Sequence, residues 1–336
     1  MPTSKSLVIA EAVKKYIDTV KTTRSEHTAR TYSNALSVFS RVLKERWKDP
    51  DSTPTTQLNE DGIAWLAAYL KTFASSTEQL YLAATAGFYE YIAAERLAEI
   101  NLPRMRLLIR QRSRRPGVRL PQLPANDIER ILEEITKQAY SEAAEGEDHV
   151  NARLRAIRDA AFLLTLADTG LRVHEACALR RGDIDWNEGR AIIIGKGDKQ
   201  AVVRFSTRAM KTLKEYLSAR ASLDGGSGRP LASLPIFSRH DKGAGKKVKP
   251  ITTTTGRNIV AERVEQILGK ESVGKITPHS FRHYFVTTVL RGSGNLKLAQ
   301  ELARHKNIQV TQRYAHLSDD ELDKGYYEIF EQNHRE

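Results

Sequence analysis

The first hundred residues show the spacing of apolar side chains that amphipathic helices require. Apolar residues recur three and four positions apart over each of four segments, which are residues 9–20, 27–47, 60–73 and 77–97. Ser25 stands just before the second segment, where its hydroxyl can accept a hydrogen bond from a free backbone amide. We therefore predict a helical N-terminal domain over residues 1–100.

The helical pattern returns at residue 125 and is interrupted once by a strand pattern. Residues 190–206, RAIIIGKGDKQAVVRFS, hold two short apolar runs around GKGDK, which is typical of a hairpin. The predicted helices of this half are residues 125–135, 152–167, 173–178, 207–220, 255–268, 279–291, 295–304 and 318–331. The pattern predicts a second domain, residues 125–336, and a fold that is mainly α with a small antiparallel β-sheet.

A basic, proline-rich stretch separates the two domains. Between residues 101 and 126 there are seven arginines, four prolines and no acidic residue. This composition is typical of an extended linker, which we place at residues 101–124. The linker either lies along a polyanion or is a solvated spacer, and its one-sided charge favours the first.

The overall charge also indicates a polyanionic partner. The 336 residues exceed the size at which one hydrophobic core keeps growing, in agreement with two domains. Lysine and arginine number 53 against 41 acidic residues, and the net charge of +12 favours nucleic acid as the partner. A basic protein that is merely solvated is the alternative.

Cysteine usage and hydropathy indicate the compartment. Cys177 is the only cysteine, so no disulfide framework and no cysteine zinc site is available. The start of the chain lacks a signal-peptide pattern, and no run of about 18 uncharged apolar residues occurs. We expect a cytoplasmic protein associated with the nucleoid, with no membrane partner.

Two common enzyme chemistries lack their required residues. His279 and His283 in HSFRH are four positions apart, but Ser280 stands where zinc peptidases carry a glutamate. GKGDK and GSGNLK lack the GxxxxGK[ST] spacing of a nucleotide-binding loop. We expect no metal site and no cofactor.

The HSFRH stretch does contain residues that can hold a phosphate. His279 and Arg282 project from one face of the predicted helix, so both can donate hydrogen bonds to one phosphate. Arg172, in DTGLRVHE, stands at a predicted helix start, where free backbone amides also favour anions. Each feature alone occurs often by chance, and their combination indicates a phosphate site.

Several motifs follow one another along the second domain. They are TGLRVHEACAL, IIIGKGDK, ITPHSFRHYF and LARHKNIQVTQRYAH. In this order and at these separations they resemble the signature motifs of the tyrosine recombinase (phage integrase and Xer-like) superfamily. The resemblance covers residues 125–325 and, more loosely, the first domain. It implies a helical core-binding domain followed by a tyrosine recombinase catalytic domain.

The resemblance implies a role for particular residues of these motifs. The implied catalytic residues are Arg172, Lys196, His279, Arg282, His305 and the nucleophile Tyr314. Lys199 is the alternative to Lys196, and the family spacing favours Lys196. Glu175 matches an acidic position that orients the first arginine. Relatives often carry glycine where this chain has Arg304, which implies either tighter DNA contact or an altered turn.

The implied reaction needs neither ATP nor a metal ion. The tyrosine attacks a DNA phosphodiester, forms a 3′-phosphotyrosine and expels a 5′ hydroxyl, which the lysine protonates. A phenol with a pKa near 10 is only about one part in a thousand ionised at pH 7, so the arginines and histidines must stabilise the developing charge. His279 either takes the phenolic proton or only binds the phosphate.

The implied partners are DNA and further copies of the chain. The resemblance implies double-stranded DNA with inverted-repeat core sites, a Holliday junction, and a synaptic tetramer that assembles from monomers or dimers. The segment DDELDKGYYEIFEQ docks either on a neighbouring subunit or on its own domain. Because no domain precedes residue 7, we expect a recombinase that needs only core sites. The candidate DNA contacts are Arg24, Arg30, Gln79, Arg112, Arg114 and Arg115.

Two other functions could use the same scaffold. A type IB topoisomerase shares the chemistry but relaxes supercoils as a monomer, and a DNA-binding regulator would keep the scaffold without the reaction. The full set of six catalytic positions argues against the regulator, and the lack of topoisomerase-specific extensions argues against the topoisomerase. We predict a site-specific DNA recombinase that serves phage integration, transposon movement, cassette exchange or chromosome-dimer resolution.

Overall fold

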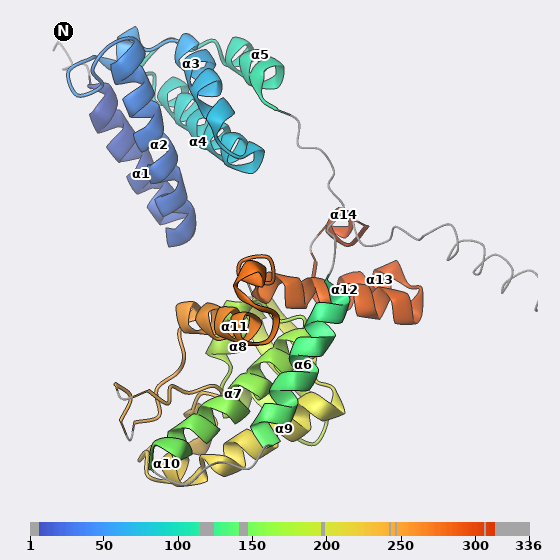
Figure 1. Cartoon of the computed structure of the whole chain (residues 1–336). Helices are drawn as coiled ribbons and strands as arrows, with labels where there is room; N and C mark the ends of the chain where they lie inside the picture. The colour runs from blue at the N-terminus through green and yellow to red at the C-terminus, as the bar shows by residue number, and fades with distance from the viewer. Residues whose placement is uncertain are drawn as a thin grey trace, which may run out of the picture. The chain divides into compact units, whose positions relative to one another are not determined.

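The computed structural model describes residues 7–114, 124–140, 147–195, 199–241, 243–245, 247–305 and 307–312. The chain divides into two units, Met1–Arg119 and Leu120–Glu336, each with its own hydrophobic core (Figure 1). Among the described residues, no helix combines the length and the apolar character that crossing a membrane requires.

Helices build the first unit, as the apolar spacing predicted. They are α1 (Ile9–Thr23), α2 (Glu26–Arg46), α3 (Asp61–Tyr69), α4 (Ser75–Ala94) and α5 (Leu102–Arg112). Ser25 caps α2 by accepting a hydrogen bond from the Thr28 amide, as expected. Phe39, Phe88 and Tyr89 are fully buried and pack against one another at the centre. The four predicted helices are confirmed, and α5 is an addition.

The prediction of an extended linker from residue 101 is wrong over its first half, which forms α5. Asn101 caps this helix by accepting a hydrogen bond from the Arg104 amide, and Pro103 occupies the first turn, where proline is tolerated. Met105 is fully buried, and the Arg104 guanidinium pairs with Glu60. The arginines of α5 surround a short apolar face, and the composition of the segment gave no indication of this face.

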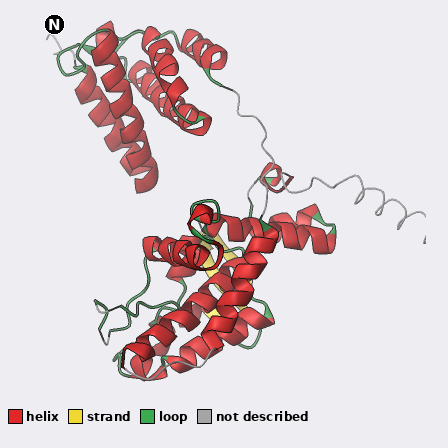
Figure 2. Ribbon diagram, in the orientation of Figure 1, coloured by secondary structure: helices red, strands yellow, loops and turns green. Residues whose placement is uncertain are grey.

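The second unit is a bundle of helices with one small sheet, as Figure 2 shows. Its helices are α6 (Ala125–Tyr140), α7 (Glu147–Thr169), α8 (Val173–Ala178), α9 (Thr207–Ala219), α10 (Ala221–Gly225), α11 (Thr253–Leu268), α12 (Pro278–Ser293), α13 (Leu296–Ala303) and α14 (Ile308–Gln312). The central helix α7 packs against α6, α9 and α12. The short α10 and α14 were not predicted, and the predicted helix 318–331 lies outside the described residues.

The sheet has the antiparallel order β1-β2-β3, with β1 (Ile184–Asp185), β2 (Arg190–Gly195) and β3 (Lys199–Arg204). Ala191 and Ile193 point into the core, whereas Ile192 between them is exposed. This alternation follows from the two-residue period of a strand, and it confirms the predicted hairpin.

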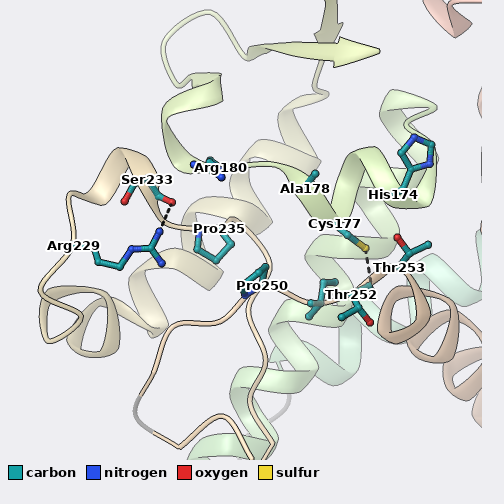
Figure 3. Close-up of a pocket in the computed structure, with 11 residues that line it drawn as sticks. His174, Cys177, Ala178, Arg180, Arg229, Ser233, Pro235, Pro250, Thr252 and Thr253 are labelled. Atoms are coloured by element: carbon teal, nitrogen blue, oxygen red, sulfur yellow. Dashed lines mark hydrogen bonds between the residues drawn. The ribbon is translucent and has the colours of Figure 1, made fainter. Parts of the chain in front are cut away.

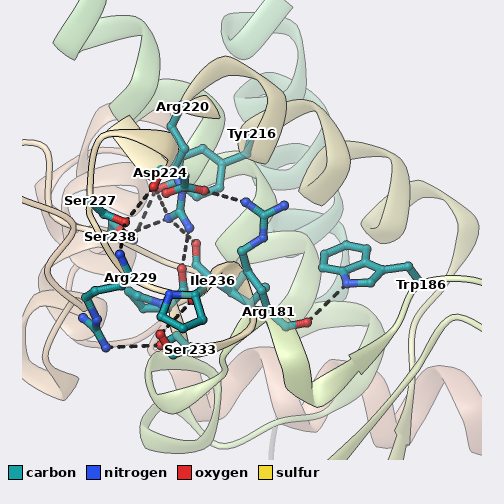
Figure 4. Close-up of polar contacts among 12 residues, drawn as sticks. Arg181, Trp186, Tyr216, Arg220, Asp224, Ser227, Arg229, Ser233, Ile236 and Ser238 are labelled. Atoms are coloured by element: carbon teal, nitrogen blue, oxygen red, sulfur yellow. Dashed lines mark hydrogen bonds and ion pairs between the residues drawn. The ribbon is translucent and has the colours of Figure 1, made fainter. Parts of the chain in front are cut away.

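A buried arginine fixes the segment that leads toward α11. Arg220, at the end of α9, is fully buried and donates hydrogen bonds to the carbonyl oxygens of Pro235 and Ile236 (Figure 4). It also donates to the Ser238 hydroxyl at 2.7 Å and pairs with Asp224. Because buried charges require internal partners, this cluster fastens the irregular segment to the helices.

Candidate active site

Segments far apart in the chain supply the four predicted catalytic residues that the structure describes. The turn between α7 and α8 supplies Arg172, the first turns of α12 supply His279 and Arg282, and His305 follows α13. Arg172, His279 and Arg282 line one cavity of about 540 Å³. The two arginines and the first histidine therefore face a common space.

Gly170 makes the turn before Arg172. Its φ is +61°, in the region that favours glycine, and a Cβ at this position would collide with the Phe285 ring. The carbonyl oxygen of Gly170 accepts a hydrogen bond from the Arg282 guanidinium. The turn thereby joins the start of α8 to α12.

Glu175 binds Arg172 at the start of α8. Its carboxylate accepts hydrogen bonds from the Arg172 backbone amide at 2.8 Å and from Arg172 Nη1 at 3.0 Å. Burial raises the pKa of Glu175, but the amide hydrogen bond and the charges of Arg304 and Arg172 outweigh burial and keep this pKa below its ordinary value. Glu175 is therefore ionised at neutral pH, while 45% of the Arg172 side chain stays exposed.

Arg282 is a buried and fixed cation. It is 3% exposed, and its guanidinium donates hydrogen bonds to the carbonyl oxygens of Gly170 and Ala303. Burial lowers the pKa of Arg282 to about 10, with a further contribution from the charge of Arg172. Arg282 still carries its charge at neutral pH, and the two backbone acceptors set its position.

Imidazole rings lie beside these arginines. The ring centroids of His279 and His283 are 4.2 Å apart, and His305 Nδ1 is 2.9 Å from the Thr311 hydroxyl. Burial, followed by the charge of Arg282, lowers the pKa of His305 to about 4 and also lowers the pKa of His279. Both imidazoles are therefore neutral at pH 7.

Arg257 of α11 also lines the cavity, and sequence analysis missed it. It follows Gly256, where a Cβ would lie 2.9 Å from the Cys177 sulfur, so α11 packs closely against α8 at this point. Arg257 has no motif around it and occupies an ordinary position on a helix. Only the packing of α11 beside the catalytic turn reveals it.

Cys177 lines a second cavity, of about 350 Å³ (Figure 3). Its thiol donates a hydrogen bond to the carbonyl oxygen of Thr252 at 3.5 Å. Burial raises the pKa of Cys177 to about 11, so it is a thiol and not a thiolate at neutral pH. Cys177 is therefore a packing residue between α8 and the start of α11, and not a rival nucleophile.

Some predicted site residues lie outside the described residues. Lys196 follows β2 in the chain, Tyr314 follows α14, and Arg115 follows the end of the described first unit. Lys199, the alternative to Lys196, pairs with Gly195 at the start of β3. The roles of Lys196 and Tyr314 stay predictions.

The predicted DNA contacts of the first unit differ in their surroundings. Arg30 and Arg112 are exposed, and the Arg24 guanidinium lies 5.8 Å from the centroid of the Tyr32 ring. These cations are accessible to a phosphate backbone. Arg24, Arg30 and Arg112 remain candidate DNA contacts.

Arg114 is instead engaged within the first unit. Its backbone amide donates to Glu78 at 2.9 Å, and its guanidinium pairs with the same buried carboxylate. Gln79 in turn donates to the Arg114 carbonyl oxygen at 3.3 Å. The charge of Arg114 compensates a buried acid while 38% of its side chain is exposed, so its contact with DNA stays a prediction.

Each of the two units matches a known domain family. Residues 121–321 match the phage integrase family, and residues 13–96 match the phage integrase N-terminal SAM-like domain. Tyrosine recombinase XerC of Pediococcus pentosaceus is 27% identical over 320 residues, which cover 94% of this chain and 96% of that one. Tyrosine recombinase XerC of Pelobacter propionicus is 35% identical over 170 residues, 51% of each chain.

A solved structure shows the same fold. The XerH site-specific recombinase bound to palindromic difH substrate matches with a TM-score of 0.62 and 21% identity, over 89% of this chain and 79% of that one. Fold and relatives together define the class, tyrosine recombinases, which are site-specific DNA recombination enzymes. The chain belongs to the phage integrase family. The resemblance of the motifs and the predicted fold class are thereby confirmed, and neither the topoisomerase nor the regulator is favoured.

Proposed function

We propose that the protein cuts and rejoins duplex DNA at a specific site, with Tyr314 as the nucleophile and a 3′-phosphotyrosyl intermediate. The observation that carries this proposal is the cavity on which Arg172, His279 and Arg282 converge. A phosphate in this cavity meets two guanidinium groups and an imidazole. Such preorganised donors stabilise the charge that grows on the non-bridging oxygens during attack.

The two arginines contribute in different ways. Arg282 is held by backbone carbonyl groups, so it supplies a fixed positive charge beneath the phosphate. Arg172 is half exposed and engages Glu175 through one guanidinium nitrogen, so its other N–H groups are available to phosphate oxygens. Together they stabilise the developing charge without a metal ion, and no cofactor is required.

The neutral histidines fit proton transfer and hydrogen bonding. A neutral His279 can accept the phenolic proton of Tyr314, which a protonated imidazole could not do. When the Thr311 hydroxyl donates to Nδ1 of His305, the proton of that imidazole is on Nε2, where it can be donated to a phosphate oxygen.

In the proposed cleavage step one bond to phosphorus forms as another breaks, and each proton has a donor and an acceptor. The Tyr314 Oη forms a bond to phosphorus while the bond from phosphorus to the 5′ oxygen breaks. The phenolic proton passes to His279, and Lys196 donates a proton to the leaving oxygen. The phosphotyrosine is again a phosphodiester, so a 5′ hydroxyl of another strand can reverse the step without ATP.

We further propose that two such exchanges pass through a Holliday junction in a tetramer that holds two DNA sites. The net charge of +12 suits a protein that surrounds DNA. The XerH complex contains a palindromic substrate, which supports inverted-repeat core sites for this chain as well. Free protein would be a monomer or dimer, and its place would be the cytoplasm, at the nucleoid.

A suicide substrate tests the proposal. Duplexes that bind the Tyr314→Phe protein are first selected from a randomised pool, and a nick is then introduced beside the cleavage position. Wild type is expected to form a covalent 3′ adduct that survives denaturing electrophoresis, whereas Tyr314→Phe binds the DNA equally and forms none. Tyr140→Phe, which alters an exposed tyrosine of α6, should react as wild type.

Two results would contradict the proposal. One is an adduct formed equally by wild type and Tyr314→Phe, and the other is no adduct from wild type on a site that it binds. Relaxation of a supercoiled plasmid that lacks the site would favour the topoisomerase instead.

A further inference from the structure

Arg304 has a backbone conformation that glycine normally supplies. Its φ is 57° and its ψ is 43°, in the left-handed region that residues with a Cβ rarely adopt. The turn that ends α13 is therefore made by a residue with a long cationic side chain. Because a side chain strains this turn, any benefit of Arg304 must come from its contacts.

The Arg304 side chain turns back toward the catalytic turn. Only 13% of the side chain is exposed, and Nη2 lies 3.0 Å from Glu175 Oε2. The same nitrogen is 3.5 Å from the carbonyl oxygen of Gly170. Arg304 therefore contacts both the carboxylate that binds Arg172 and the glycine that starts the turn.

Glu175 is thereby shared between two arginines. Its Oε1 accepts from Arg172 Nη1 at 3.0 Å, while its Oε2 accepts from the Arg172 amide at 2.8 Å and from Arg304 at 3.0 Å. A buried carboxylate with a single arginine partner tends to bind both guanidinium nitrogens and to cancel the charge. With Arg304 on Oε2, Arg172 needs only one nitrogen for Glu175.

Arg304 is not itself positioned as a phosphate ligand. It is absent from the described residues that line the cavity of Arg172, His279 and Arg282. Its exposed fraction is 13%, against 45% for Arg172. The hydrogen bonds of Arg304 connect it to the phosphate site through Glu175, which binds Arg172, and through the Gly170 carbonyl group.

We propose that Arg304 is a positioning residue of the recombination reaction, which neutralises Glu175 so that Arg172 is free to hold the attacked phosphate. The proposal rests on the function proposed above. It makes a specific requirement: Arg304 should become dispensable when residue 175 carries no charge.

Single-turnover cleavage of the nicked duplex tests this requirement. Arg304→Met keeps an unbranched apolar stem and the backbone strain and removes the charge, and it should cleave about ten- to hundredfold more slowly than wild type. Arg304→Lys, which keeps the charge, should recover most of the rate. The double variant Arg304→Met/Glu175→Gln should cleave as fast as Glu175→Gln alone, because the charge that Arg304 neutralises is gone.

Controls separate this role from the alternatives. DNA affinity is measured for each variant with Tyr314→Phe added, and thermal unfolding shows whether each variant is folded. Arg304→Gln replaces Arg304→Met if the latter does not fold. Arg304→Gly relieves the backbone strain and should remain as slow as Arg304→Met.

Three results would overturn the inference alone. They are a wild-type rate for Arg304→Met, a wild-type rate for Arg304→Gly, and a double variant in which the two losses multiply. The last result would make Arg304 a phosphate ligand in its own right. Absence of any adduct from wild type would instead contradict the proposed function, and with it this inference.

Discussion

Two clusters of the second unit contain the same chemical groups and differ in access to solvent. In one, Arg181 and Arg220 share the carboxylate of Asp224 (Figure 4). In the other, Arg172 and Arg304 share the carboxylate of Glu175. Both carboxylates are buried, and both have more positive than negative charge beside them.

The two clusters differ in whether the arginine N–H groups remain available to a ligand. Arg220 is 0% exposed, and each of its guanidinium nitrogens donates to an acceptor within the protein. Arg172 is 45% exposed and faces a cavity. Both the structural cluster and the functional cluster therefore have an excess of positive charge. Accessible hydrogen-bond donors beside a cavity distinguish the functional cluster.

We call the cluster of Arg181, Arg220 and Asp224 the saturated cluster, because the Arg220 donors all have acceptors within the protein. The largest expected effect is on its contribution to stability. Arg220→Met removes one of the two arginine partners of a buried carboxylate and leaves two buried carbonyl groups without their donor, so we expect a loss of about 3–5 kcal/mol in the free energy of unfolding. Urea unfolding measures this loss. Cleavage per folded molecule should match wild type. A selective loss of cleavage would show that this cluster is not purely structural.

The cluster of Arg172, Arg304 and Glu175, which we call the unsaturated cluster, should affect cleavage more than stability. Arg172→Met removes a donor to the transition state, so the single-turnover cleavage rate should fall by about a hundred- to a thousandfold. Its free energy of unfolding should stay within about 1 kcal/mol of wild type, because Arg304 still pairs with Glu175. Unfolding as severe as that of Arg220→Met would show that both clusters are structural.

The positive field of the saturated cluster should appear in the pH dependence of stability. Burial, followed by the charges of Arg158 and Arg220, lowers the pKa of His240 from 6.5 to about 4. As pH falls from 6.5 to 4, the unfolded chain binds a proton that the folded protein does not, so the unfolding free energy falls by up to about 3 kcal/mol. Above pH 6.5 this contribution is fully present.

His240→Gln isolates this contribution. The variant should lose part of the slope between pH 6.5 and 4 in urea unfolding, and the remaining slope belongs to groups such as His283 and His305, whose pKa values burial also lowers to about 4. Identical slopes for wild type and His240→Gln would contradict the assignment.

An exposed ion pair supplies the smallest effect and the reference for the other two clusters. Lys137 and Glu134 on α6 are 2.8 Å apart, with 69% and 41% of their side chains exposed. Lys137→Ala should leave the urea midpoint of unfolding unchanged within error, because water screens the pair, and cleavage should not change. A clear shift of that midpoint to lower urea would show that exposure is a poor guide here.

Much of the fold follows from apolar spacing. The helices of the first unit and the hairpin of the second were predicted because each has a regular period of buried residues. α5 was missed because its arginines dominate the composition, while Met105 is its one fully buried residue and Leu102, Leu108 and Ile109 pack beside it. A count of charged residues reflects the solvent-exposed side of this helix and does not indicate that its other side is buried.

The site was predictable only in part. His279 and Arg282 share a helix face, so their spacing sufficed, whereas Arg257 approaches them only through the packing of α11. The left-handed backbone of Arg304 and its contact with Glu175 depend on how α13 ends beside α8. The internal pairing of Arg114 with Glu78 likewise follows from packing and not from any motif.

Mapping the covalent adduct identifies the nucleophile without relying on a substitution. The wild-type adduct on the nicked duplex is digested with nuclease and trypsin, and the nucleotide-bearing peptide is sequenced by mass spectrometry. We expect a phosphonucleotide on Tyr314 and on no other residue. A nucleotide linked to a different side chain would contradict it.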